Sequence, residues 1–175
     1  LYGREEQGFT LALANELRAR LPEITFIGEP TPNVLQLAQL TKDTDELMRI
    51  RALAATALGA VADTRQLLAA HAVEKGRLVT ENGAPLTVGD VQREIRRWSV
   101  ERNLENPEGM IFASGRDAGV PHSRGQEDAP LSLGETIVFD YFPREAGGGY
   151  FYDFTRTWCL GHAPPVIEQA HEQVL

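Results

Sequence analysis

The sequence is poor in cysteine, in basic residues and in long apolar runs, and each shortage excludes a class of protein. Cys159 is the only cysteine among 175 residues, so neither an internal disulfide nor a zinc site built from paired cysteines can form. Lys and Arg total 17 against 25 Asp and Glu, a net charge of −8, which disfavours nucleic-acid and anionic-membrane partners because both need a basic face. No segment reaches the roughly 20 consecutive apolar residues that cross a bilayer. We therefore expect a cytoplasmic protein with no nucleic-acid partner and no membrane partner.

What the sequence does contain is typical of a folded globular chain. Hydrophobic residues make up 42% and charged residues 24%, and the length suffices for one core plus part of a second domain. The first residue is Leu1 rather than Met, and the helical pattern over 165–175 continues to the last residue. We expect a fragment of a longer protein or a processed chain.

Turn-forming residues divide the chain into two parts. Residues 5–20 have a helical pattern, and the proline-containing stretch 28–33 predicts a linker. A boundary near residue 40 follows, with one part over 1–40 and the other over 41–175. In the second part, apolar spacing predicts helices over 43–74 and from Thr87 onward, the latter opened by a capping box.

Two strands are predicted near the end of the chain. Residues 136–142 and 150–159 are rich in β-branched and aromatic side chains. Between them lies a loop that contains Pro143 and three consecutive glycines, Gly147 to Gly149. The two strands should therefore form a hairpin.

Two aspartates interrupt this otherwise apolar hairpin. Pairing Phe142 with Phe151 places Asp140 directly opposite Asp153, and alternation places both on one face. The other face then carries an aromatic packing surface, formed by Ile137, Phe139, Tyr141, Tyr152 and Phe154. Opposed carboxylates about 5 Å apart repel each other, and either a divalent cation or protonation of one partner relieves the repulsion. The residues alone leave open a third interpretation, in which one aspartate faces solvent on a plain surface hairpin.

The motifs around these aspartates resemble those of a known enzyme family. The chain resembles the pita-bread metallopeptidases, which include Xaa-Pro aminopeptidases, prolidases and creatinases, at Asp140, Gly149-Tyr150, Asp153-Phe154-Thr155-Arg156-Thr157 and Gly161. A weaker match is the start of the helix at Lys42, Glu46, Ile50 and Arg51. The resemblance implies that Asp140 and Asp153 bind a pair of divalent metal ions, either manganese, cobalt, zinc or iron.

A loop histidine precedes the hairpin. The segment that contains Gly115, Asp117, Pro121 and His122 is similar to the family's "G-x-[ND]-x-x-x-PH" pattern. Without that context, His122 is an ordinary exposed loop residue. The resemblance implies that it contacts the substrate near the scissile bond and donates to developing oxyanion charge.

The resemblance also implies a fold and an activity. We expect an α+β chain, the first half of a pita-bread fold, with helices over 43–101 packed on an antiparallel sheet and with residues 1–40 as the tail of a creatinase-like N-terminal domain. The implied activity is hydrolysis of the N-terminal bond of a peptide substrate, Xaa-Pro by preference, by a hydroxide shared between two metals. A homodimer is an assembly that the resemblance leaves open.

This chain lacks part of the implied site. The family's remaining ligands, one histidine and two glutamates, would follow residue 175, so we expect the chain alone to be inactive. Two alternatives remain: a non-catalytic pita-bread binding module, and a creatinase-like hydrolase that cleaves a small C–N substrate without metal. Retention of Asp140, Asp153 and His122 counts against the first, and retention of the two aspartates counts against the second.

Overall fold

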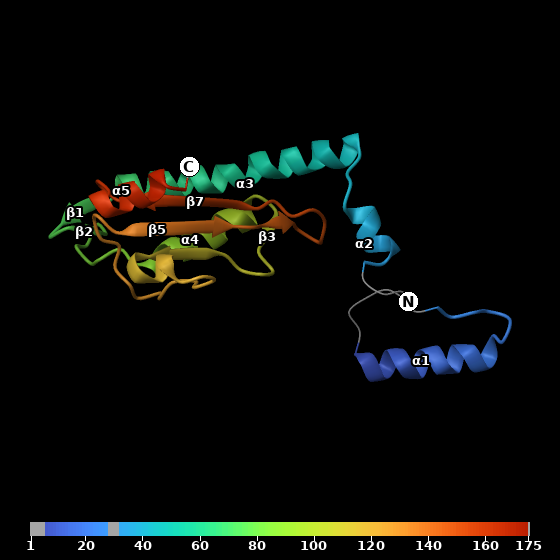
Figure 1. Cartoon of the computed structure of the whole chain (residues 1–175). Helices are drawn as coiled ribbons and strands as arrows, with labels where there is room; N and C mark the ends of the chain where they lie inside the picture. The colour runs from blue at the N-terminus through green and yellow to red at the C-terminus, as the bar shows by residue number, and fades with distance from the viewer. Residues whose placement is uncertain (1–5, 28–31, 175) are drawn as a thin grey trace. The chain divides into compact units, whose positions relative to one another are not determined.

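The chain folds into two compact units. The computed structural model describes residues 6–27 and 32–174 (Figure 1). The units are Leu1–Asp43 and Thr44–Leu175. Most of the predicted linker over 28–33 lies outside the described residues. That residues 1–40 are the tail of a creatinase-like domain stays a prediction.

The first unit contains two capped helices, α1 (Gln7–Arg20) and α2 (Val34–Gln39). The Glu6 carboxylate accepts the backbone N–H groups of two residues in the first turn of α1. A reciprocal capping box between Asn33 and Gln36 opens α2. Neither helix has a buried residue, so capping and not core packing stabilises these two helices.

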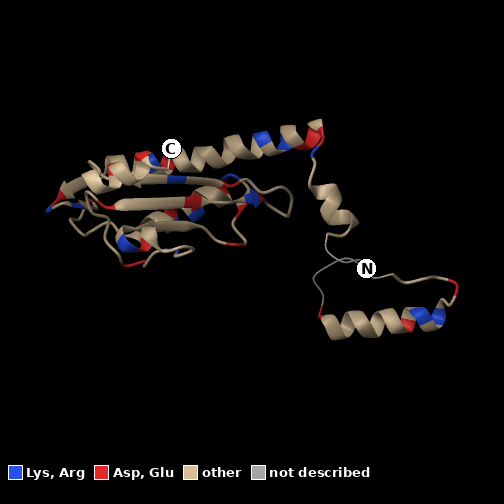
Figure 2. Ribbon diagram, viewed as in Figure 1, with Lys and Arg blue, Asp and Glu red and all other residues tan. Residues whose placement is uncertain are grey.

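The second unit contains the two main helices, α3 (Thr44–Ala70) and α4 (Val88–Glu101). The predicted helix over 43–74 ends earlier, at Ala70, because the chain enters a short hairpin there. The predicted capping box at Thr87 and Asp90 is confirmed, with both reciprocal bonds present. Acidic residues in the first turn of α3 face the positive end of its dipole (Figure 2).

A three-stranded antiparallel sheet carries the residues of interest. Its order is β4 (Ile111–Ser114), β5 (Thr136–Tyr141) and β7 (Phe154–Cys159). Side chains of β5 alternate between buried and half-buried, as expected for a strand with one covered face. The covered face presents Ile137, Phe139 and Tyr141, each fully buried, to a core that also includes apolar residues of α3 and α4. The predicted fold class, helices on an antiparallel sheet, is confirmed.

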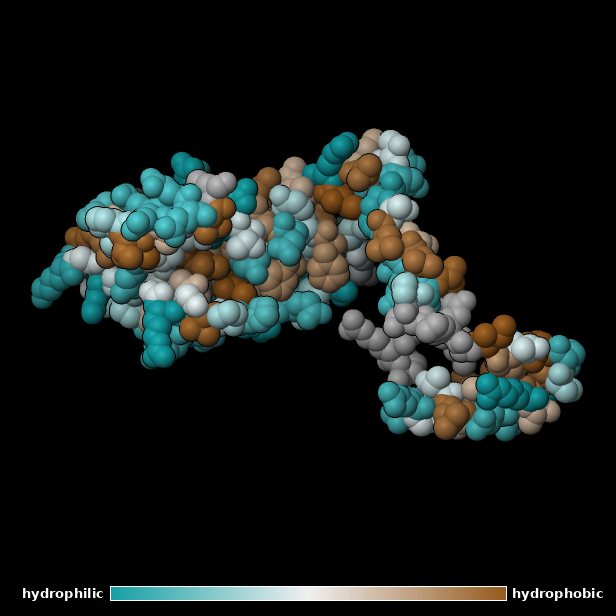
Figure 3. Space-filling view, in the orientation of Figure 1, coloured by the Kyte–Doolittle hydropathy of each residue, from teal (hydrophilic) through white to brown (hydrophobic). Residues whose placement is uncertain are grey.

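Short elements complete the second unit. These are β1 (Ala72–Glu74) paired with β2 (Arg77–Val79), β3 (Leu104–Glu105) paired with β6 (Arg144–Glu145), the 3₁₀ turn η1 (Gly115–Gly119) and α5 (Pro165–Glu172). Hydrophilic and hydrophobic side chains are interspersed over the visible face of this unit (Figure 3). Among the helices that the structure describes, none has the length and apolar character needed to span a bilayer.

Candidate functional site

Asp140 lies on β5 and Asp153 immediately precedes β7, in a register two residues away from the predicted one. Asp140 pairs with Thr155, and the predicted partner of Phe142, Phe151, instead bridges Arg144. The predicted direct opposition of Asp140 and Asp153 is therefore wrong. A shift of two positions leaves each side chain on the same face, because side chains alternate with a period of two. Asp153 is thus a diagonal neighbour of Asp140.

The glycine-rich turn explains the register. Extended pairing continues past the end of β5, with the Tyr152 N–H donating to the Pro143 carbonyl at 2.9 Å and the Glu145 N–H donating to the Tyr150 carbonyl at 3.3 Å. The remaining turn is short, and Gly147 and Gly148 occupy it with φ of 80° and 96°, which L side chains rarely adopt. The turn is centred between residues 147 and 148, one position later than the predicted pairing implies, and this moves every pair along by two residues.

Asp140 and Asp153 act on each other electrostatically. The Thr155 hydroxyl donates to Oδ1 of Asp140 at 2.7 Å, which fixes that carboxylate on the open face of the sheet. Partial burial raises the pKa of Asp153, and the negative charge of Asp140 and a hydrogen bond with its carboxylate raise it further. Because the pair favours an extra positive charge, it can accept either a proton or a cation.

This donor set fits a hard divalent cation. Carboxylate oxygens are the ligands that such ions prefer, and an ion between two carboxylates turns their repulsion into coordination. Within residues 6–27 and 32–174, no group of three or more His, Cys, Asp and Glu side chains is placed to hold a metal ion. The two aspartates offer fewer ligands than the roughly six or more that a hard divalent ion takes.

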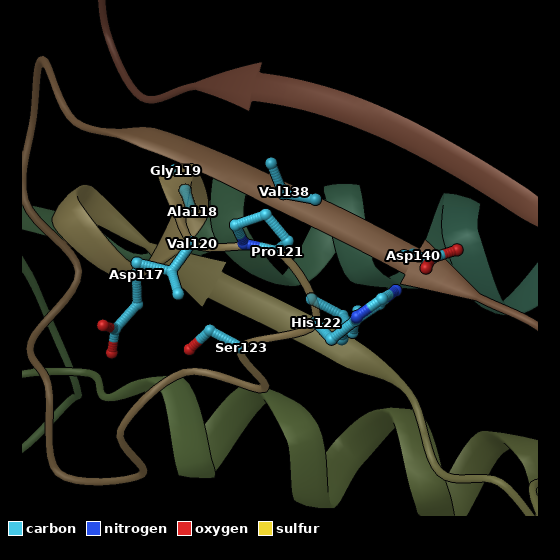
Figure 4. A pocket seen from close by; sticks show the side chains of 10 residues that line it. Asp117, Ala118, Gly119, Val120, Pro121, His122, Ser123, Val138 and Asp140 are labelled. Atoms are coloured by element: carbon cyan, nitrogen blue, oxygen red, sulfur yellow. The ribbon is translucent and has the colours of Figure 1, made fainter.

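His122 and Asp140 line the same cavity. The cavity has a volume of about 300 Å³ and lies between the open face of the sheet and the loop over 117–123. In Figure 4 the His122 ring extends toward the end where Asp140 projects from β5, whereas Asp117 lies on the opposite side. Apolar walls come from Ile111 and Val138 on the strands. The structure thus brings together a carboxylate, an imidazole and an apolar surface.

Buried polar contacts hold the loop that presents His122. The side chain of Gln92 on α4, only 4% exposed, donates to the carbonyl of Arg124 at 2.8 Å and to that of Phe112 at 3.3 Å. These bonds tie the loop to both α4 and β4. His122 itself has a φ of 61°, in the left-handed region that few residues other than glycine adopt. A strained histidine at a cavity mouth is consistent with a functional constraint.

Sequence reasoning missed the residues that anchor the connection between β5 and β7. The predicted plain hairpin loop instead contains β6, which leaves the sheet to pair with β3. Glu145 in β6 forms an ion pair with Arg49 on α3, 96 positions away. Nothing in local spacing signals a contact at that separation. In the sequence, only the presence of Arg144 and Glu145 in a glycine-rich loop indicates that this loop has partners elsewhere.

Comparison with known proteins identifies the family. The model of metallopeptidase family M24 matches residues 46–175, which include both aspartates and His122. The chain belongs to metallopeptidase family M24. The predicted resemblance is thereby confirmed. No curated protein matches the chain.

Solved structures share the fold of this M24 chain. An X-Pro aminopeptidase from Thermotoga maritima MSB8 matches with a TM-score of 0.70 and 19% identity, over 93% of this chain and 41% of that one. A prolidase from Pyrococcus furiosus matches with a TM-score of 0.65 and 19% identity, over 82% and 38%. A putative aminopeptidase P from Bacillus anthracis matches with a TM-score of 0.68 and 21% identity, over 98% and 38%. The M24 chain spans about two fifths of the length of these structures.

Proposed function

We propose that this M24 chain supplies part of the active site of a metal-dependent Xaa-Pro aminopeptidase or dipeptidase. One observation carries the proposal: Asp140 and Asp153 share the open face of adjacent strands, and Asp140 also lines a cavity with His122. The names of the structural neighbours, an X-Pro aminopeptidase and a prolidase, support a peptide substrate with proline after the N-terminal residue. We place the protein in the cytoplasm and leave a homodimer as the proposed assembly.

Each residue has a distinct role in this proposal. Asp140 and Asp153 would hold two divalent ions, for which manganese, cobalt, zinc and iron are candidates. When bound, such ions supply Lewis acidity and lower the pKa of water toward neutrality. The Thr155 hydroxyl orients the Asp140 carboxylate through its 2.7 Å bond. The His122 imidazole donates a hydrogen bond to the oxygen of the scissile carbonyl as negative charge develops there.

The cavity provides the surroundings for that step. Ile111 and Val138 form an apolar wall that accepts the substrate's side chain and excludes water, which strengthens the interaction between His122 and the developing charge. Hard divalent ions take about six ligands, more than two carboxylates provide. We therefore propose that the 175-residue chain does not hydrolyse peptides by itself and that activity needs the remainder of a longer polypeptide.

The test uses the longest polypeptide that the reading frame encodes around this chain. We expect Asp153→Asn to remove bound metal, measured by elemental analysis, and to abolish hydrolysis of Xaa-Pro dipeptides. His122→Ala should lower turnover by about a hundredfold, the usual effect of losing one oxyanion donor, while metal content stays unchanged. Full metal content in Asp153→Asn contradicts the ligand assignment, and loss of metal in His122→Ala contradicts the histidine's role. Metal-independent hydrolysis of a small C–N substrate supports the creatinase-like alternative, and absence of any hydrolysis supports the binding module.

A further inference from the structure

An ionic fork joins helix α3 to the connection between β5 and β7. The Arg49 guanidinium donates from Nε to Glu145 Oε1 at 2.8 Å, and its terminal nitrogen lies 2.7 Å from Oε2. Two parallel bonds of this kind define direction as well as distance. The hydrogen bonds and the charge of Arg49 lower the pKa of the Glu145 carboxyl, so the pair is ionised at neutral pH.

The same glutamate also holds the end of the turn. Oε2 of Glu145 accepts the backbone N–H of Tyr150 at 3.2 Å, and the Tyr150 hydroxyl donates to the Glu46 carboxylate on α3. The Arg49 guanidinium lies over the Tyr150 ring, 5.5 Å from its centroid. A side chain at Gly149 would collide with the Glu145 carboxylate, which accounts for glycine there. The turn is thus fastened to α3 by two contacts, at Glu145 and at Tyr150.

A second attachment holds the other side of the turn. Glu105 in β3 accepts from Arg144 at 3.0 and 2.9 Å and from the Gly147 backbone N–H at 2.8 Å. The Ala146 N–H donates to the Asn103 carbonyl at 3.0 Å. A turn with three consecutive glycines has high conformational entropy when unrestrained. These contacts therefore restrict a segment that its glycines would otherwise leave flexible.

The restriction matters because of where Asp153 lies. Asp153 lies between the last ladder pair, Phe154 with Tyr141, and the bond from the Tyr152 N–H to the Pro143 carbonyl, so the path of the turn affects where its carboxylate lies. Its carboxylate is nevertheless beside that of Asp140, against their mutual repulsion. We propose that Arg49 and Glu145 are positioning residues that hold Asp153 beside Asp140 for metal binding. This inference rests on the proposed metal-binding role of the two aspartates.

The experiment measures metal binding and local order in the longest polypeptide that the reading frame encodes around this chain. Mn²⁺ is titrated into isotopically labelled protein, and paramagnetic broadening of backbone amide signals is followed near residues 140 and 153. We expect Arg49→Gln and Glu145→Gln to weaken Mn²⁺ binding by about tenfold, as is usual for residues that orient metal ligands, with the broadening near residue 153 reduced most. Arg49→Lys keeps the charge and should restore part of the affinity.

A second measurement needs no metal. Without Mn²⁺, amide hydrogen exchange over residues 150–153 should accelerate in Arg49→Gln and remain unchanged in Arg97→Gln. Arg97 is a matched control because it forms ion pairs with Glu94 and Glu101 on α4, and its side chain is 53% exposed against 56% for Arg49. A partly exposed ion pair adds little to global stability, so the unfolding midpoints of both variants should stay close to that of the unmodified chain.

The outcomes separate the inference from the proposed function. Localised broadening in the unmodified chain, with equal Mn²⁺ affinity and equal exchange in Arg49→Gln, overturns the positioning role and leaves the metal site standing. No localised broadening in the unmodified chain removes the metal site and the inference with it. If Arg49→Gln lowers the unfolding midpoint substantially, Glu145→Gln decides: unchanged Mn²⁺ affinity in that folded variant also contradicts the proposal.

Discussion

Asp153 carries a charge that its immediate surroundings oppose. Burial and the neighbouring Asp140 both raise the pKa of its carboxyl, and only the Phe154 N–H acts in the other direction. In the absence of a cation, the ionised form of Asp153 therefore destabilises the folded state relative to the unfolded one. The same feature favours binding of a positive ion, because coordination removes the repulsion.

We predict that Asp153→Asn stabilises the metal-free chain at neutral pH. A carboxyl whose pKa is raised in the folded state stabilises the fold less as pH rises through that pKa, so the penalty is larger at pH 7 than near pH 3.8, the ordinary pKa of this group. The gain at pH 7 should be about 0.2–1 kcal/mol, the usual range for cross-strand charge pairs. Urea unfolding in EDTA at pH 7 and pH 4 measures it.

The control for that prediction is Asp128→Asn, a change of the same charge at an exposed position of another loop. It should leave the free energy of unfolding nearly the same at both pH values. Excess divalent cation should stabilise the unmodified chain and not Asp153→Asn. A stability gain in Asp153→Asn that is equal at both pH values contradicts the assigned cause.

Residue types and their alternation were sufficient to predict which faces Asp140 and Phe139 occupy, because a strand with one covered face permits no other assignment. The presence of His122 near Asp140 followed only from the family resemblance, since loop backbone carries no periodicity. The Arg49–Glu145 pair could not be predicted at all. Its partners are 96 positions apart, and a charge on a helix surface has many potential partners.

At the scale of elements, the loop that presents His122 depends on close packing of backbone against backbone. A Cβ at Gly125 would lie 2.7 Å from the Phe112 carbonyl oxygen and 3.0 Å from the Ala113 Cα, so a side chain there pushes the loop away from β4. Gln92 supports the same junction from α4. The geometry of the cavity thus depends on how closely this loop approaches the edge strand.

We predict that Gly125→Ala destabilises the chain more than Gly83→Ala does. The two glycines have nearly the same φ, 80° and 79°, but nothing lies within 4 Å of a Cβ at Gly83. Both variants should lose about 1 kcal/mol from the left-handed backbone, and Gly125→Ala should lose roughly 1–3 kcal/mol more from overpacking. Urea unfolding measures both. Equal losses would show that the loop can move away from β4 without cost.

The register of the β5–β7 pair illustrates what pattern alone leaves undetermined. Shifting the pairing by two residues keeps every side chain on its face, so hydrophobic alternation is satisfied equally by the predicted and the observed registers. The turn determines which register forms, because the observed tight connection requires positive φ at Gly147 and Gly148. Charged residues of the turn then find partners on α3 and β3, contacts that no local pattern encodes.

At the scale of the whole molecule, the two units differ in what stabilises them. The core of the second unit draws on residues from Leu53 to Tyr141, together with partly buried aromatic residues that follow. In the first unit, Phe9 is 58% exposed and neither helix buries a residue. The M24 family model likewise begins at residue 46, close to the division between the units.

We predict that removing residues 1–43 leaves the second unit folded, with a thermal midpoint within about 2 °C of that of the full chain. The reason is that, among the described residues, every buried residue of the core belongs to the second unit, and a midpoint shift of that size corresponds to about 0.5–1 kcal/mol at most. Circular dichroism during heating measures the midpoint. Removing residues 1–57 is the contrasting control, because it deletes Leu53 and Ala57, which are 4% and 0% exposed, and should unfold the unit. A fall of more than about 5 °C in the shorter deletion would mean that the first unit contributes substantially to the stability of the second.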